Sequence, residues 1–96
     1  MYAYCQEMPE VTEEMATKVE TEVGKAPVAG LVAHVSGPTA TGWRIIDVWE
    51  SEDDYHRFVD ERLNPALQVA TRGQTPPSRP FDFLPVTSVN GLARRA

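Results

Sequence analysis

The order of extended and helical patterns along the chain limits its fold more than any other feature of the sequence. Residues 43–50 alternate between two sets of side chains, which is typical of a β-strand. The turn-forming residues 37–42 join this run to an earlier extended run at 28–36. Two such runs joined by a loop predict a β-hairpin in the middle of the chain.

Amphipathic helical patterns flank this hairpin on both sides. In residues 11–23 the apolar side chains recur at four-residue spacing, and Gly24 follows as a natural stop. Ser51 precedes the second pattern as a helix cap, with acidic residues directly after it. We expect Asn64-Pro65 to break this second helix and to start another short one, since proline is tolerated at the first helical position.

Two further extended runs complete the pattern, at 1–7 and at 81–89, the second after a proline-rich linker at 72–80. The order is therefore β-α-β-β-α-β. It predicts an α+β domain of the ferredoxin-like type, an antiparallel sheet with both helices on one face. We expect a single domain over residues 1–89 and a flexible C-terminal tail over 90–96.

Length and composition exclude several functional classes. Nine Lys/Arg against fourteen Asp/Glu give a net charge of −5, and the basic residues are scattered apart from Arg94-Arg95, so we expect no nucleic-acid partner. No apolar run is long enough to cross a membrane and no signal-peptide layout is present, which predicts a soluble, cytoplasmic protein. The lone Cys5 forms no internal disulfide and is expected to be a small core residue. A chain of 96 residues can form only a small core, which predicts that a partner subunit completes the apolar burial.

Alternation along each strand divides the side chains between the two faces of the sheet. We assign the small aliphatic side chains to the face that the helices cover: Ala3, Cys5, Leu31, Ala33, Val35, Ile46, Val48, Leu84 and Val86. The open face then carries an aromatic patch with two polar groups: Tyr2, Tyr4, Val32, His34, Trp43, Ile45, Asp47, Trp49 and Phe83. Apolar surroundings with a few convergent polar groups are typical of a small-molecule site. We therefore predict that the seven residues other than His34 and Asp47 bind an aromatic ligand on the open face.

His34 and Asp47 are the candidate catalytic residues of this site. A neutral imidazole in an apolar cavity can remove a phenol or enol proton, and Asp47 on the adjacent strand can orient it. Two interpretations stay open: His34 acts as this base, or it hydrogen-bonds a structural partner. Asp47 pairs with His34, with Arg44 or with water, because a buried carboxylate is costly unless it is paired. The tryptophans and tyrosines either hold a planar substrate or fill the core and the subunit interface.

A resemblance to a known superfamily rests on three places in the sequence: Gly42-Trp43, Trp49-Glu50-Ser51, and Tyr55 with Phe58 on the helix that follows. With these residues, the chain resembles the dimeric α/β-barrel superfamily that includes the antibiotic-biosynthesis monooxygenases, over roughly residues 1–89. The resemblance implies a homodimer packed sheet to sheet, with a pocket either between each sheet and its own helices or within the barrel. It further implies a cofactor-independent monooxygenase or cyclase acting on an aromatic polyketide-like substrate. The alternatives are a non-catalytic ligand-binding or accessory homodimer and a structural dimer with an empty cavity.

The residue at position 58 indicates whether the chain could bind haem. Haem-degrading and several monooxygenase relatives usually carry a histidine where this chain has Phe58. His56 lies two residues earlier, about 200° around the helix, and cannot take its place. We therefore expect no haem, and no cofactor or metal.

Overall fold

The computed structural model describes residues 1–74, 76 and 78–90. Its elements follow in this order: β1 (Tyr2–Pro9), α1 (Glu13–Val23), β2 (Leu31–Pro38), β3 (Gly42–Trp49), α2 (Glu52–Phe58), the π-helical turn η1 (Val59–Leu63), α3 (Asn64–Thr71) and β4 (Leu84–Pro85). The predicted β-α-β-β-α-β order is thereby confirmed. The expected tail over 90–96 lies outside the described residues, except for Asn90.

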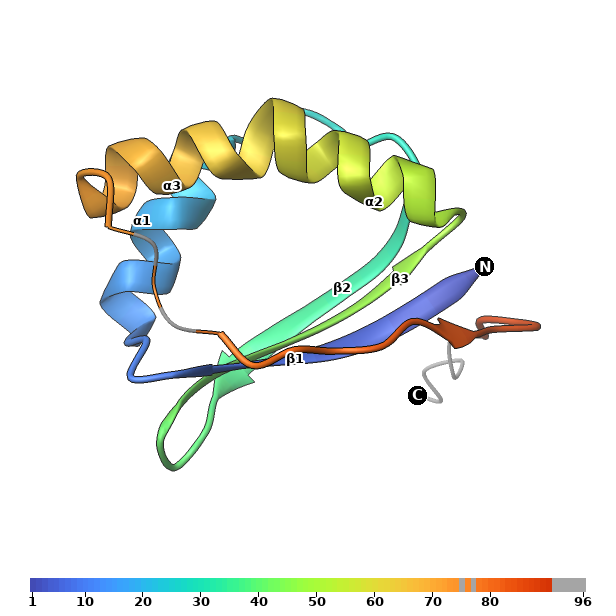
Figure 1. Cartoon of the computed structure of the whole chain (residues 1–96). Helices are drawn as coiled ribbons and strands as arrows, with labels where there is room; N and C mark the ends of the chain where they lie inside the picture. The colour runs from blue at the N-terminus through green and yellow to red at the C-terminus, as the bar shows by residue number, and fades with distance from the viewer. Residues whose placement is uncertain (75, 77, 91–96) are drawn as a thin grey trace, which may run out of the picture.

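The four strands form one antiparallel sheet in the order β2-β3-β1-β4. The helices lie on one face of this sheet, with the α2–α3 rod running above the strands (Figure 1). This is the α+β, ferredoxin-like architecture that the sequence predicts. Among the described residues, no helix has both the length and the apolar character needed to cross a bilayer.

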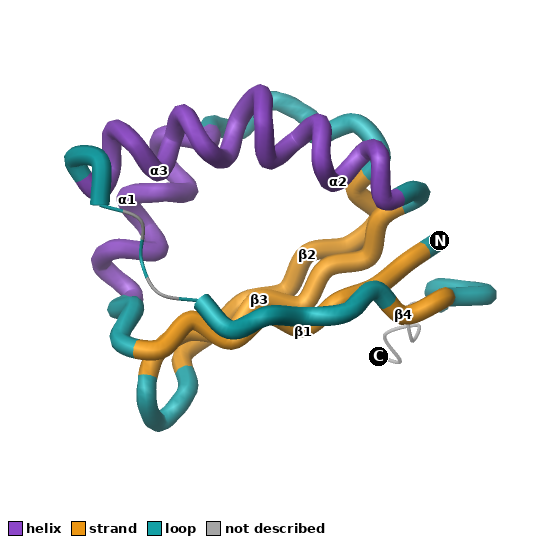
Figure 2. Tube along the Cα trace, in the orientation of Figure 1, coloured by secondary structure: helices purple, strands orange, loops and turns teal. Residues whose placement is uncertain are grey.

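The last strand is shorter than the run expected at 81–89. Only Leu84–Pro85 pairs as a regular strand with β1. The chain around it nevertheless follows β1, because Arg79 N–H donates to the Glu7 carbonyl and Val86 N–H to that of Met1, both at 2.8 Å (Figure 2). Pro80 and Pro85 have no N–H to donate, which limits a regular ladder.

The second helix is not broken at Asn64-Pro65, so that prediction is wrong. Phe58, Leu63 and Asn64 all keep right-handed helical backbone angles, and α2, η1 and α3 form one continuous helical rod. Within a regular helix, a proline ring clashes with the carbonyl four residues earlier. In η1 the Asn64 N–H bonds instead to the carbonyl of Val59, five residues earlier. This wider turn accommodates Pro65 without ending the helix.

Alternation groups the strand residues correctly except at Leu31 and Val32, but the assignment of the two groups to faces is wrong. The aromatic group lies under the helices, where these members are buried: Tyr4, Trp43, Asp47 and Trp49. The small aliphatic group lies on the open face, where Val35 and Ile46 are exposed. Cys5 is exposed there too, which corrects its expected core position. The large rings fill the space between sheet and helices, because each buries far more apolar surface than an alanine or valine.

The backbones of β1 and β3 approach closely at Gly42, which pairs with Pro9 at the end of the two strands. A Cβ at Gly42 would collide with the Met8 carbonyl, whereas a Cβ at Gly37 would meet open space. We expect Gly42→Ala to lower the free energy of unfolding by about 1–3 kcal/mol, since the backbone must move apart. Gly37→Ala should change it by less than about 1 kcal/mol. Urea unfolding followed by tryptophan fluorescence measures the free energy of unfolding of both variants. Equal losses in the two variants would contradict the close approach of the strands at Gly42.

Candidate active site

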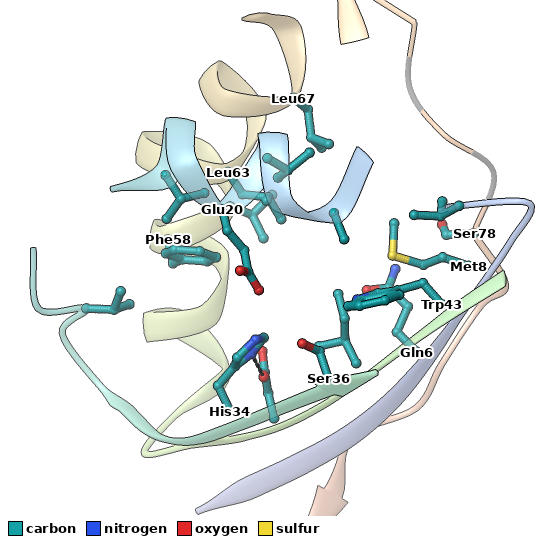
Figure 3. Close-up of a pocket in the computed structure, with 18 of the residues that line it drawn as sticks. Gln6, Met8, Glu20, His34, Ser36, Trp43, Phe58, Leu63, Leu67 and Ser78 are labelled. Carbon is teal, nitrogen blue, oxygen red and sulfur yellow. Dashed lines mark hydrogen bonds and ion pairs between the residues drawn. The ribbon is translucent and has the colours of Figure 1, made fainter. Parts of the chain in front are cut away.

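A cavity of about 690 Å³ lies between the sheet and its own helices (Figure 3). Of the two positions that the resemblance allows, the structure thus has the one enclosed within a single subunit. The apolar side chains of the roof come from α1, the residue before its cap and the α2–α3 rod: Val11, Met15, Val19, Val23, Phe58, Leu63 and Leu67. Polar groups of the lining come from the strands of the floor (Tyr4, Gln6, His34, Ser36 and Asp47) and also from the helix side (Thr17, Glu20, Thr21, Lys25 and Asn64).

Asp47 is the centre of the floor. It lies opposite Tyr4 on β1 and opposite His34 on β2, so the three side chains form one row across the sheet. The Tyr4 hydroxyl donates to Asp47 Oδ2 at 2.6 Å, and His34 Nδ1 lies 2.6 Å from Asp47 Oδ1. Asp47 is 4% exposed. Both oxygens of this buried carboxylate are therefore hydrogen-bonded, as a buried charge requires.

The geometry decides between the partners that the sequence left open for Asp47. Arg44 lies on the opposite face of the sheet, where its Nε donates to Glu7 Oε1 at 2.6 Å. Asp47 pairs with His34 and Tyr4 instead.

The pairing with Asp47 also determines which nitrogen of His34 carries the hydrogen, and it affects the pKa of the ring. An ionised carboxylate only accepts hydrogen bonds, so His34 Nδ1 carries the hydrogen and Nε2 is left for a ligand. The hydrogen bond to Asp47 raises the pKa of the His34 imidazole, burial works against this, and the charges of Asp47 and Glu20 raise it further. Glu20 belongs to α1, and its carboxylate points across the cavity toward His34 (Figure 3). His34 is thus a stronger base than a free histidine.

Tyr4 remains a hydrogen-bond donor over the whole physiological pH range. Burial and the neighbouring charge of Asp47 raise the pKa of the Tyr4 phenol well above its ordinary value. Its ring stacks on Phe81 with centroids 4.3 Å apart and meets Phe83 edge-on at 5.7 Å. The segment that follows the linker therefore holds Tyr4 against Asp47.

The two tryptophans have different surroundings. Trp49 is completely buried and packs against Tyr55 and Phe58, with ring centroids 5.8 and 5.4 Å apart. Its Nε1 has no hydrogen-bond partner in the described part of the chain. Trp43 lines the other end of the cavity (Figure 3). Trp49 fills the core, and Trp43 is the ring placed beside the open volume.

Three of the predicted binding residues do not line the cavity. Tyr2 packs edge-on against Phe83, at 6.4 Å, and Phe83 lies over Tyr4 and Tyr55 rather than inside the cavity. Val32 is 39% exposed, because a β-bulge between Leu31 and Ala33 changes the alternation there. Leu31 takes the inward position and lines the cavity in its place.

The structure brings the other six predicted residues together in the lining: Tyr4, His34, Trp43, Ile45, Asp47 and Trp49. It also adds Gln6, Ser36 and Glu20. Gln6 and Ser36 have the same alternation as Tyr4 and His34, which places them on this face without assigning them a role. Within the described residues, no group of three or more His, Cys, Asp or Glu could hold a metal ion.

Comparison with known proteins gives structural neighbours only. No protein-family profile matches the chain, and no curated protein matches its sequence. A candidate antibiotic biosynthesis monooxygenase from Chloroflexus aurantiacus is 11% identical with a TM-score of 0.68, over 94% of this chain and 96% of that one. A second such candidate, from Deinococcus radiodurans, is 9% identical with a TM-score of 0.62, over 97% and 99%.

A third neighbour is a mutant of SnoaB, a cofactor-independent oxygenase from Streptomyces nogalater. It is 12% identical with a TM-score of 0.59, over 92% of this chain and 93% of that one. Identities this low show a shared fold. The chain therefore has the ferredoxin-like fold of the antibiotic biosynthesis monooxygenase-like proteins, as its resemblance to them predicts.

Proposed function

We propose that the chain is a cofactor-independent enzyme that oxygenates or cyclises a flat, aromatic, polyketide-like compound in this cavity. The observation that carries the proposal is the buried Asp47 carboxylate, held by Tyr4 on one oxygen and by His34 on the other beneath apolar walls. Such a pair is suited to a general base. The shared fold with SnoaB, a cofactor-independent oxygenase, supports the reaction class. A non-catalytic ligand-binding protein is the alternative, since the same walls would hold a ligand without turnover.

The first step in either reaction is removal of an acidic C–H or O–H proton by His34 Nε2. Asp47 stabilises the imidazolium that forms, because the carboxylate is already hydrogen-bonded to Nδ1. The Asp47 carboxylate is buried, whereas the His34 side chain stays 40% exposed, so solvent reaches the imidazole side of this pair. In cyclisation, the carbanion attacks a carbonyl carbon of the same molecule and the alkoxide recovers the proton. In oxygenation, the carbanion reduces dioxygen; an anthrone CH₂ becomes C=O, and the second oxygen atom leaves as water.

Tyr4 takes a positioning role in this mechanism, in place of the substrate-binding role expected from the sequence. Its hydroxyl is engaged with Asp47 Oδ2, so it holds the carboxylate in the plane that His34 needs. It also shares the negative charge, and therefore limits how strongly Asp47 raises the pKa of His34.

His34→Ala should lower kcat/KM for oxidation of an anthrone by about 100- to 10,000-fold, the usual contribution of a general base. His56→Ala is the matched control, because His56 is exposed on α2 and does not line the cavity. Oxygen uptake and quinone absorbance measure both. A His34→Ala protein with full turnover would overturn the base assignment. Binding without turnover in the unchanged protein, over a panel of anthrones and naphthols, would favour the non-catalytic alternative.

The pH dependence of kcat/KM tests whether Asp47 and Tyr4 control the pKa of His34. The base is the neutral imidazole, so kcat/KM should fall as pH drops through a pKa above the ordinary histidine value. Asp47→Asn should move this fall to lower pH, because the charge that raises the pKa is gone, and should also reduce the maximal rate. Tyr4→Phe should move it to higher pH, because Asp47 then carries its charge with one donor fewer. Tyr2→Phe is the control for Tyr4→Phe, because Tyr2 lies on the same strand and does not line the cavity. Proton NMR of the His34 ring gives the same pKa without turnover, and unchanged titration in both row variants would argue against the coupling.

We also propose that a second copy of the chain covers the open face of the sheet. Cys5, Ile46 and Val35 form a row across three strands of this face, and Val35 is 60% exposed. An exposed aliphatic row of this kind is typical of an interface. The cavity lies on the other face, so in this dimer each subunit keeps a complete site.

Val35→Asp should shift the protein from a dimer to the 10.7 kDa monomer in sedimentation equilibrium, since an unpaired carboxylate at an apolar interface is costly. Val69→Asp is the control, because Val69 on α3 is equally exposed, at 62%, but lies on the helix side. If both variants keep the mass of the unchanged protein, the interface lies elsewhere; if the unchanged protein is a monomer, the dimer proposal fails.

A further inference from the structure

The floor of the cavity consists of successive rows of side chains across the sheet. The first row is Tyr4–Asp47–His34, and the second is Gln6–Ile45–Ser36, two residues further along each strand. Two residues of a strand span about 7 Å, so the second row lies about the length of a two-ring aromatic system away from the first. Trp43 begins the next row and closes this end of the floor.

The two rows differ in the hydrogen bonds that they leave for a ligand. In the first row Asp47 and Tyr4 satisfy each other, and only His34 Nε2 is available. In the second row, Gln6 and Ser36 face the cavity, and neither side chain hydrogen-bonds another described residue (Figure 3). Both are half-buried beside apolar walls, where polar groups usually have a partner. A ligand resting on Ile45 would supply one.

The charged side chains of the cavity lining limit which ligand group can hydrogen-bond Gln6 and Ser36. Gln6 and Ser36 are neutral and offer an N–H and an O–H to an oxygen atom. The carboxylates of Asp47 and Glu20 line the same cavity and outnumber its one lysine, Lys25, which disfavours a carboxylate or phosphate there. A ketone or phenol oxygen fits these donors.

We propose that Gln6 and Ser36 form a second polar subsite that binds a carbonyl or phenol oxygen of the substrate, on the other side of a fused ring system from the proton that His34 removes. This inference rests on the proposed function and specifies its substrate: a fused aromatic compound with oxygen substituents on opposite sides of the ring system. When that oxygen is conjugated to the deprotonated carbon, it receives part of the negative charge. Donors already aimed at it then stabilise the transition state more than the ground state.

Binding of simple naphthols tests the subsite without requiring turnover. The unchanged protein should bind 1,5-dihydroxynaphthalene about 3- to 10-fold more tightly than 1-naphthol, the usual gain from one added hydrogen bond. The isomer 2,3-dihydroxynaphthalene, with both oxygens on one side, should show no such gain. Quenching of ligand fluorescence gives the three dissociation constants.

The preference for the 1,5-diol should disappear in the double variant Gln6→Leu/Ser36→Ala and weaken in Ser36→Ala alone. Thr17→Ala is the matched control, because it removes a cavity-lining hydroxyl from α1 and should leave the preference unchanged. The single Ser36→Ala change covers the case in which the double variant does not fold.

The outcomes separate this inference from the proposed function. Equal binding of the three naphthols to the unchanged protein, or a preference that survives in the variants, would overturn the subsite and leave the His34 chemistry in place. Failure of every naphthol to bind would contradict the aromatic substrate itself, and the subsite with it. A lost preference in the double variant, with a normal His34 titration, is the result that supports the subsite.

Discussion

The buried carboxylate of Asp47 is the constraint on which the rest of the site depends. A charge in this position requires partners on both oxygens, and only neighbouring strands in the correct register supply them. Tyr4 from β1 and His34 from β2 meet it from the two sides. Antiparallel pairing of three strands thereby brings together the three side chains to which we assign the roles of base, orienting carboxylate and positioning phenol.

The helices determine the surroundings of Tyr4, Asp47 and His34. On the open face, the same residues would lie in water or against a partner. Under α1 and the α2–α3 rod, they form the polar floor of an apolar cavity, where a carboxylate acts strongly on an imidazole. The π-helical turn matters for this reason, because it keeps the rod continuous through Pro65 above the floor. The open face is then left for the proposed second subunit, so the proposed catalysis and the proposed assembly would use opposite faces of one sheet.

Some parts of this arrangement could be predicted from the sequence. The predictions that failed rest on rules for regular strands and helices, and the chain departs from both. Alternation put Tyr4, His34, Asp47 and Trp43 on one face, because neighbouring side chains of a strand must point opposite ways. It failed at Val32, where a bulge adds one residue to β2, and bulges leave little trace in short strands. Asn64-Pro65 was expected to break the helix, since the rule for proline assumes a regular α-helix.

The sequence by itself determined the order of elements, the ferredoxin-like architecture and which side chains share a face. These follow from periodicity and turn residues, which are local properties of the chain. Only the tertiary structure decided which face the helices cover, because either face carries enough apolar surface to be buried. It also decided that Asp47 pairs with His34 and Tyr4 rather than with Arg44. The hydrogen bonds of a buried charge depend on contacts between strands that no local pattern contains.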